Sequence, residues 1–312
     1  MQNYLRDFSG QNGIHAVSAR RLSADCSDPA PANCWVVDED ALTIAVEEVG
    51  TYTLMWTPTE GAASAAGFVA GEGVLGATEA PERLALAVGF AFTEGIIAGV
   101  QDIASMEVCP ERPDIVRMRL LAPAGVKVRR SNVLMTSSCG VCGGRDVLEH
   151  GLADLPGVAD TLRMSVAGFV PLMAAMQQHQ SIFGITGGTH AALVFSGDQQ
   201  ILAAAEDLGR HNALDKVIGR CLLQQKRLSG CGVVLSSRLS FEMIAKAARA
   251  GFEVVAAVSA PSSLAIRMAE RLGITLCGFV RGECTTVYTH PGRIRELGLE
   301  PATATRTTTQ RA

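Results

Sequence analysis

From Met164 onward the chain alternates between strand-like and helix-like segments, and this pattern leaves few folds open. Apolar runs of strand length occur at 191–195, 233–235, 254–258 and 274–280. Segments with helical periodicity occur at 164–180, 212–225, 240–250 and 262–272. Strands separated by helices of about ten residues imply βαβ crossovers, and hence a largely parallel sheet covered by helices on both faces. The sequence therefore predicts an α/β fold for this half of the chain.

The sequence pattern in the first half of the chain predicts a smaller, mixed α+β domain. Residues 42–46 and 52–56 are strand-like and form a predicted hairpin, and the pattern over 80–97 predicts a buried helix that ends near Glu94-Gly95. Residues 1–34 are polar and proline-containing, which predicts a mobile extension, with ordered structure from about Trp35. The predicted division is an extension (1–34), an α+β domain (35–130), a cysteine-containing loop region (131–150), an α/β domain (151–300) and a disordered tail (301–312).

Composition narrows the functional classes. At 312 residues, 48% of them hydrophobic, the chain can form two domains with a substantial core, and its net charge of −4 provides no basic surface for general nucleic-acid binding. Nine cysteines, an odd number, are typical of free thiols in a reducing compartment. Residues 1–17 contain no apolar signal-peptide core, and polar residues and glycines interrupt the apolar stretch at 84–100. We expect a cytoplasmic protein that binds neither nucleic acid nor membrane.

The most direct sign of chemistry is a C-x-x-C pair, Cys139 and Cys142, placed among glycines and serines at 137–144. A structural zinc site usually needs two such pairs, and the cysteines at 26, 34, 109, 221, 231, 277 and 284 form no second one, so we expect no metal site. A thioredoxin-type redox pair would begin a long helix after a strand; 133–135 could be that strand, but Gly143 and Gly144 disfavour the helix. Two unreactive cysteines in a turn also fit the pattern. The small glycines leave room for another molecule's sulfur, which favours a thiolate that accepts sulfur and passes it on.

Polar residues follow two of the predicted strands. Ligands of such sheets bind beyond the carboxyl ends of the strands. Residue 235 runs into Ser236-Ser237-Arg238-Leu239-Ser240, and residue 258 runs into Ser259-Ala260-Pro261-Ser262-Ser263. Each segment leads into a helix start, whose free N–H groups favour a phosphate, and Arg238 adds further donors. Ser240 and Ser262 can equally be plain N-caps.

Two further polar segments carry imidazoles. Residues 184–190 form a glycine-rich turn that ends in His190, and residues 206–212 bring together charged and hydrogen-bonding side chains, including Arg210 and His211. Asp215 lies four residues after His211, a spacing at which a helical carboxylate can hold the ring in one tautomer. Taken singly, each histidine is better explained by a structural hydrogen bond. Together, these residues form a concentrated set of donors.

The motifs together resemble those of a known family, the formate dehydrogenase accessory sulfurtransferases of the FdhD/NarQ family. The resemblance spans about 42–295 and rests on specific motifs: Thr93-Glu94-Gly95-Ile96-Ile97, Ser137 to Gly144, Thr186-Gly187-Gly188 with His190-Ala191-Ala192, Glu206 to Ala213 with Asp215-Lys216, and Gly278-Phe279-Val280-Arg281 followed by Val287-Tyr288. It implies that the larger domain has a three-layer α/β fold similar to that of cytidine deaminases, without their zinc chemistry.

The resemblance also implies an activity and a site. Cys139 would carry sulfur as a persulfide and Cys142 would be the assisting thiol. The substrate would be the molybdenum bis(molybdopterin guanine dinucleotide) cofactor, with no permanently bound cofactor. The cofactor would lie against Phe279, Val280, Arg281, Gly282, Glu283 and Cys284. The polar segments above add further candidates for cofactor binding: Thr186, Gly187, Gly188, His190, Arg210, His211, Ser236 and Arg238.

The implied partners are a cysteine desulfurase as sulfur donor and the catalytic subunit of formate dehydrogenase as cofactor recipient, with the protein itself a homodimer. Two other hypotheses stay open. One is a non-catalytic chaperone that binds the molybdenum cofactor, with cysteines that only line its site. The other is a C-x-x-C dithiol redox protein. Transfer of label from cysteine to the protein separates the carrier from the chaperone.

Overall fold

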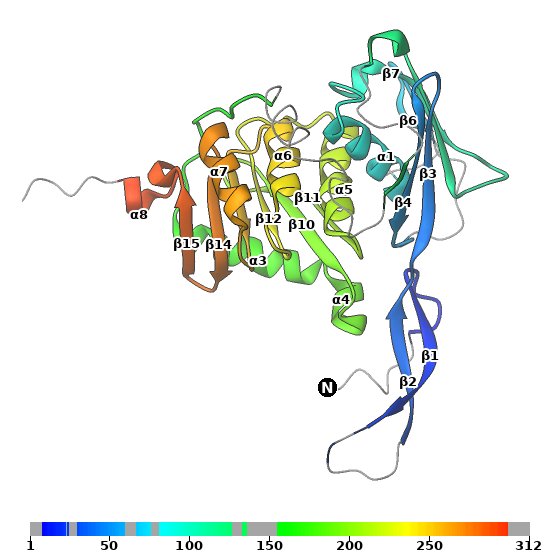
Figure 1. Ribbon diagram of the computed structural model, residues 1–312, viewed down its shortest axis with the longest axis horizontal. Coiled ribbons are helices and arrows are strands. Elements are labelled where there is room, and N and C mark those ends of the chain that lie inside the picture. The colour runs from blue at the N-terminus through cyan, green and yellow to red at the C-terminus, as the bar shows by residue number, and fades with distance from the viewer. Residues whose placement is uncertain are drawn as a thin grey trace, which may run out of the picture.

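The computed structural model describes residues 8–22, 24, 30–59, 67–75, 81–126, 133–135 and 155–298. These residues form a larger C-terminal domain and a smaller N-terminal domain, from which a two-stranded hairpin projects (Figure 1). The two domains pack side by side through helices α1 (Glu82–Thr93) and α5 (Arg210–Leu223).

The sheet of the larger domain has the strand order β11-β10-β12-β13-β14-β15. Its strands are β10 (His190–Phe195), β11 (Ile201–Asp207), β12 (Gly232–Leu235), β13 (Val254–Ala257), β14 (Thr275–Arg281) and β15 (Cys284–Thr289). Only the neighbours β12, β13 and β14 pair in parallel, whereas β10 is antiparallel to both β11 and β12, and β15 is antiparallel to β14. The prediction of a largely parallel sheet is therefore wrong, because short turns fold β10–β11 and β14–β15 into hairpins. The sheet is mixed.

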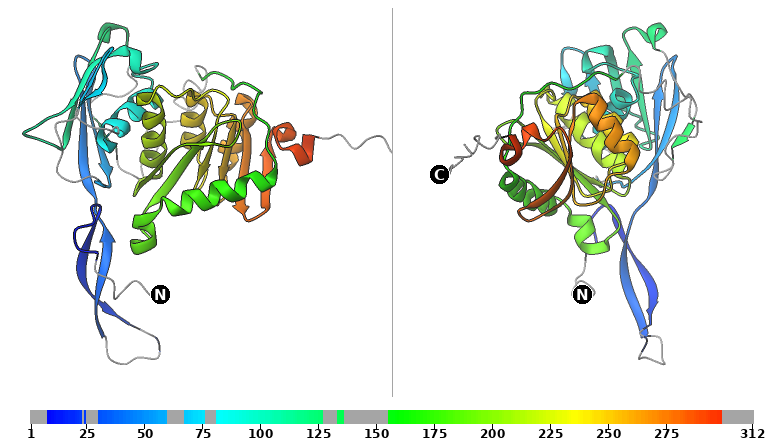
Figure 2. Two further views of the ribbon diagram at one scale, coloured as in Figure 1. Left: turned by 180° about the vertical axis from the view of Figure 1, so that it is seen from behind. Right: turned by 60° about the vertical axis from the view of Figure 1, so that its left-hand side comes forward.

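Helices cover both faces of this sheet, as the sequence predicts (Figure 2). One face packs against α5, α6 (Phe241–Ala250) and α7 (Ser263–Leu272), and the opposite face packs against α3 (Phe169–Gln178). Side chains of β10 alternate between the two cores: Val194 faces the α5 side and Leu193 the α3 side. Helices α6 and α7 both end at a glycine in the left-handed region, at φ 76° and 78°.

The smaller domain is built on a seven-stranded sheet in the order β6-β5-β7-β8-β3-β4-β9, packed against α1. Its strands are β3 (Asp40–Val46), β4 (Gly50–Trp56), β5 (Gly67–Val69), β6 (Gly73–Leu75), β7 (Ile103–Val108), β8 (Ile115–Leu120) and β9 (Val133–Met135). The predicted hairpin at 42–56 is confirmed as β3 and β4. The predicted helix and its predicted end near Glu94-Gly95 are confirmed: α1 ends at Thr93, and Gly95 takes a left-handed φ of 77° just beyond it.

The N-terminal residues differ from the prediction. Strand β1 (Ile14–Arg21) pairs antiparallel with β2 (Ala30–Val37), so regular structure begins well before Trp35. At the base of this hairpin Ile14 is buried, and the ring of Phe8 packs edge-on against Trp35 with centroids 5.8 Å apart. These contacts between residues far apart in the sequence explain why the polar segment forms regular structure, which its composition did not predict.

Short elements complete the description. They are α4 (Ser181–Thr186), α8 (Arg295–Gly298) and 3-10 turns at Val100–Asp102, Pro123–Gly125, Val166–Gly168 and Pro291–Arg293.

Close approach of α1 and α5 joins the domains. A methyl group added at Gly89 would lie 1.8 Å from the carbonyl oxygen of Asp215, and one added at Gly219 would lie 1.8 Å from that of Ala85. Only glycine allows the two backbones to come this near. The ammonium of Lys216, whose side chain is fully buried, adds contacts of 2.9 Å to Glu82 and 2.8 Å to Asp207. The relative position of the domains is thus fixed by tight packing and by buried charge.

Candidate functional site

One edge of the larger sheet gathers most of the candidate residues. Strands β12, β13 and β14 end at this edge because they are parallel. Strand β10 begins there, since Ala192 lies opposite Leu235 in the antiparallel pair. His190 and Phe279 are separated along the edge by three strand spacings, or roughly 14 Å. The edge therefore offers an elongated rather than a compact binding surface.

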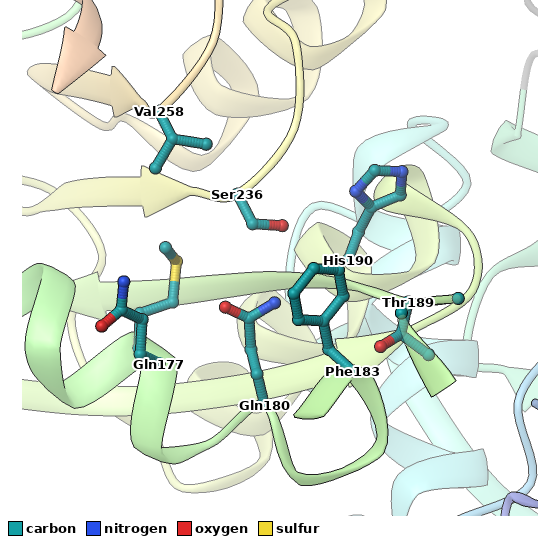
Figure 3. A pocket seen from close by; sticks show the side chains of 10 residues that line it. Gln177, Gln180, Phe183, Thr189, His190, Ser236 and Val258 are labelled. Atoms are coloured by element: carbon teal, nitrogen blue, oxygen red, sulfur yellow. The ribbon is translucent and has the colours of Figure 1, made fainter. Parts of the chain in front are cut away.

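A pocket with a cavity volume of about 340 Å³ opens at this edge (Figure 3). His190 and Ser236 line it from β10 and the end of β12, Gln177 from α3, Gln180 from the turn between α3 and α4, and Phe183 from α4. Phe183 is exposed, so its ring is available as an apolar wall. The lining also includes Gly187 and Gly188, which are among the candidates from the sequence, and Thr189 and Val258, which are not.

Hydrogen bonds fix several of these groups. The Ser236 hydroxyl accepts a hydrogen bond from the Ala191 N–H at 2.8 Å, and a hydroxyl can also donate its own proton. The carboxylate of Glu206 accepts hydrogen bonds from the N–H groups of Ile182, at 3.0 Å, and Phe183, at 2.6 Å. Thr186 closes the turn, because its hydroxyl donates to the Ile182 carbonyl and accepts from the Gly188 N–H. Thr186 thus shapes the pocket, whereas Ser236 lines it.

The pocket lining is electrically neutral near pH 7. Burial lowers the pKa of His190, and the nearby guanidinium groups of Arg210 and Arg238 lower it further. The imidazole is therefore uncharged at neutral pH. The other lining side chains are amides, hydroxyls and apolar groups. Such a surface suits the neutral, ring-shaped part of a ligand rather than its phosphates.

Cationic side chains lie beside the pocket. Arg210 begins α5, and Arg238 is exposed in the segment between β12 and α6. Burial lowers the pKa of Arg210, and the nearby charge of Arg238 lowers it further. The carboxylate of Glu242 acts in the opposite direction and raises this pKa, but it does not outweigh the other two effects. The predicted pairing of His211 with Asp215 is wrong: the Nε2 atom of His211 lies 3.0 Å from the Glu242 carboxylate.

Asp215 points instead toward α1 and α6. It accepts a hydrogen bond from the hydroxyl of Thr93 at 2.8 Å and forms an ion pair with Lys246 at 2.8 Å. The spacing of residues 211 and 215 places both on one side of α5, but each finds a nearer partner on another helix.

The two serines at helix starts differ. Ser262 is an N-cap, since its hydroxyl accepts from the Ala265 N–H at 3.2 Å. The hydroxyl of Ser240 makes no cap bond and is buried without a hydrogen-bond partner among the described residues. Of these two serines, only Ser240 therefore has a hydroxyl without a hydrogen-bond partner among the described residues.

The end of β14, the turn after it and the first residue of β15 contain the remaining cofactor candidates. Phe279 is 42% exposed and has a φ of 52°, a left-handed conformation that is uncommon for a bulky residue. Its N–H donates to the Ser259 carbonyl at 3.2 Å, which ties this turn to the end of β13. Arg281, Gly282, Glu283 and Cys284 are exposed. Val280, at 1% exposure, packs in the core beneath α3, so only its backbone can reach a ligand.

Cys139 and Cys142 lie outside the described residues. The expected strand at 133–135 is confirmed as β9, and it runs parallel to β4. Within the described residues, no helix is long and apolar enough to span a membrane. The same residues contain no group of three or more histidine, cysteine or acidic side chains suited to hold a metal ion.

The side chains of segment 206–212 point in two directions, although the sequence predicted them as one set of candidates. Glu206, Asp207 and Asn212 are buried and bonded to protein groups, whereas Arg210 and His211 belong to the ligand edge. Sequence reasoning also missed Gln177, Gln180, Phe183 and Glu242. No motif marks these residues, and only the packing of α3, α4 and α6 brings them to the site.

The fold defines a class of two-domain proteins. In this class, a mixed α/β domain carries a ligand-binding edge at its strand ends and is joined to a second, β-rich domain. Residues 78–295 match the FdhD/NarQ family. The chain is 39% identical over 212 residues to the sulfur carrier protein FdhD of Bordetella petrii, covering 67% of this chain and 76% of that protein. It is 40% identical over 229 residues to the protein of the same name from Nocardia farcinica, covering 69% and 80%. The chain therefore belongs to the FdhD/NarQ family.

A solved structure has the same fold. The crystal structure of a candidate formate dehydrogenase accessory protein from Desulfotalea psychrophila superimposes with a TM-score of 0.65 at 20% identity. The match covers 89% of this chain and 99% of that one, so it includes both domains.

Proposed function

We propose that this protein is a sulfur carrier that accepts sulfur as a persulfide on Cys139 from a cysteine desulfurase. It then transfers the sulfur to the molybdenum bis(molybdopterin guanine dinucleotide) cofactor of formate dehydrogenase. Membership of the FdhD/NarQ family, with curated relatives named sulfur carrier protein FdhD, supports the general role. The observation that supports the cofactor as substrate is the neutral pocket beside Arg210 and Arg238 on one sheet edge.

The edge matches the parts of such a cofactor. The neutral pocket, with the amides of Gln177 and Gln180, offers donors and acceptors to the edge of a heterocycle, and Phe183 offers a ring face. Arg210 and Arg238 are suited to the pyrophosphate. Phe279, roughly 14 Å from His190 along the edge, and Arg281, two residues further on, provide a second ring and a second cation for the rest of an elongated ligand.

Loading begins with the thiolate of Cys139. It attacks the terminal sulfur of a persulfide on the desulfurase, so that a new S–S bond forms on Cys139 while the old one breaks. The desulfurase cysteine leaves as a thiolate with the electron pair of the broken bond. The glycines at 140, 143 and 144, which all follow Cys139 in the sequence, leave room for another molecule to approach its sulfur atom.

Release uses the second thiol. The thiolate of Cys142 attacks the sulfur of Cys139, a disulfide forms between the two cysteines, and the terminal sulfur leaves as hydrosulfide toward the molybdenum of the substrate. The electron pair that reduces the transferred sulfur comes from the cysteine thiolates. An external dithiol must therefore reduce the disulfide before the next cycle.

The test follows sulfur. The protein is incubated with a cysteine desulfurase and ³⁵S-cysteine, and non-reducing gels measure label on the wild type and on Cys139→Ala. We expect label on the wild type alone, and no support of formate dehydrogenase activity by Cys139→Ala. Cys284→Ala, which removes an exposed thiol outside the C-x-x-C pair, is the matched control and should label normally. A wild type that binds the cofactor but acquires no label would identify a chaperone instead.

A further inference from the structure

The carboxyl-terminal end of β4 is attached to the ligand edge by buried hydrogen bonds. Thr57 directly follows β4 and is fully buried. Its N–H donates to the Asp207 carboxylate at 3.1 Å, and its hydroxyl accepts from the Leu208 N–H at 3.0 Å. The amide of Asn212 donates to the Met55 carbonyl at 2.7 Å and to Asp207 at 2.9 Å. We call Thr57, Asp207 and Asn212 the clamp.

The clamp lies between the two parts of the protein that the proposed reaction uses, the cofactor edge and the strand that precedes Cys139. On one side, Asp207 accepts from the Gly209 N–H at 2.8 Å and so shapes the turn that presents Arg210 and His211. On the other side, β4 is the neighbour of β9, and Met135 at the end of β9 lies opposite Leu54. Because the two strands are parallel, β9 ends on the same side of the sheet as the end of β4 that precedes Thr57. Cys139 follows Met135 by four residues, a span of at most about 14 Å.

We propose that the clamp residues are positioning residues for sulfur transfer. They hold the end of the β4–β9 pair, from which the persulfide-bearing segment departs, in register with the arginines of the cofactor edge. This inference rests on the proposed function. Loading of Cys139 requires only the thiol and the desulfurase, and nucleotide binding requires only the edge. Transfer alone requires both parts to be aligned, so it is the step that the clamp governs.

Thr57→Val tests the proposal, because it retains the shape of the side chain and removes only the acceptor for Leu208. Three quantities are measured: label loaded on Cys139, affinity for GDP as a cofactor fragment, and the rate at which label passes from Cys139 to purified cofactor. We expect loading and GDP affinity within about twofold of wild type, and transfer slower by about tenfold or more, because small misplacements of reacting groups are costly. Thr57→Ser restores the hydroxyl and should restore the rate.

Two further variants separate positioning from stability. Arg220→Gln breaks another contact between the domains, the 2.6 Å ion pair with Glu82, and should lower the unfolding midpoint without slowing transfer. Asn212→Ala removes the link to Met55 and should reproduce the transfer defect, which provides a second test if Thr57→Val folds poorly. Normal transfer by Thr57→Val or by folded Asn212→Ala would overturn the proposal. So would an equal defect in Arg220→Gln. The proposed function fails separately, if Cys139→Ala still transfers sulfur.

Discussion

Replacing Lys216 by Met should destabilise the protein by about 3–5 kcal/mol, because it strips buried carboxylates of their cation. The ammonium of Lys216 lies 2.8 Å from Asp207 and 2.9 Å from Glu82, and the three side chains are 0–9% exposed. Met matches the length of the aliphatic chain beside the Trp56 ring, over which the ammonium lies at 5.0 Å. The loss is therefore electrostatic rather than a cavity effect. Glu82 would retain Arg220, whereas Asp207 would keep only neutral donors.

Urea unfolding, followed by circular dichroism, measures the change in free energy of unfolding. Arg220→Met is the matched control: its side chain is partly exposed, and its loss should cost roughly 1 kcal/mol or less. Adding Asp207→Asn to Lys216→Met should recover part of the loss, because it removes the stranded charge. A loss below about 1 kcal/mol for Lys216→Met, or no recovery in the double variant, would refute this account of the interface.

The pH dependence has a definite sign. Burial opposes ionisation of Glu82, but Lys216 and Arg220 outweigh it and hold the pKa of Glu82 below its usual value. A depressed carboxyl pKa contributes stability above the unfolded-state pKa, and this stability is lost as the pH falls through the folded-state pKa. The difference between wild type and Lys216→Met should thus be greatest near neutral pH and should shrink on acidification below the usual carboxyl range.

Three further predictions concern the edge and the core. Arg281→Ala should weaken GDP binding about ten- to a hundredfold by calorimetry, the loss of one charge-assisted contact of about 1.5–3 kcal/mol, with sulfur loading unchanged. Gly219→Ala should cost at least about 1–3 kcal/mol in urea unfolding, since its methyl group would meet a backbone carbonyl at 1.8 Å; Gly184→Ala, with open space around it, should be nearly neutral. Arg238→Ala should raise the pKa of His190 in an NMR titration, because it removes a cation that disfavours the imidazolium.

The helices and strands that the sequence predicted correctly are those that short-range residue patterns determine. Strands such as β12 and β13 are apolar throughout because helices cover both of their faces, and residues 240–250 and 262–272 carry helix-start serines and end before glycines. Strand order and direction are long-range properties. The pairing of β10 with β11 and with β12 cannot be read from the composition of any of them, so the mixed sheet went unpredicted.

The candidate site was predictable in part for the same reason. His190 begins β10, Ser236 follows β12 and Phe279 lies near the end of β14, and strand ends of one sheet share an edge. Gln177 and Gln180 belong to helix α3 and its end, and nothing in their local sequence distinguishes them from solvent-facing glutamines. The left-handed φ of Phe279 is equally hidden, because the bulge at the end of β14 depends on pairing with β15.

The segment 206–212 has a consequence for mutagenesis. Asp207 and Asn212 bind the neighbouring domain, while Arg210 and His211, which lie between them in the sequence, face the ligand edge. Any substitution in the segment can therefore impair function by two routes, loss of a ligand contact or loss of alignment between domains. Ligand affinity and transfer rate must be measured separately to distinguish them. A defect in both indicates the edge, and a defect in transfer alone indicates the clamp.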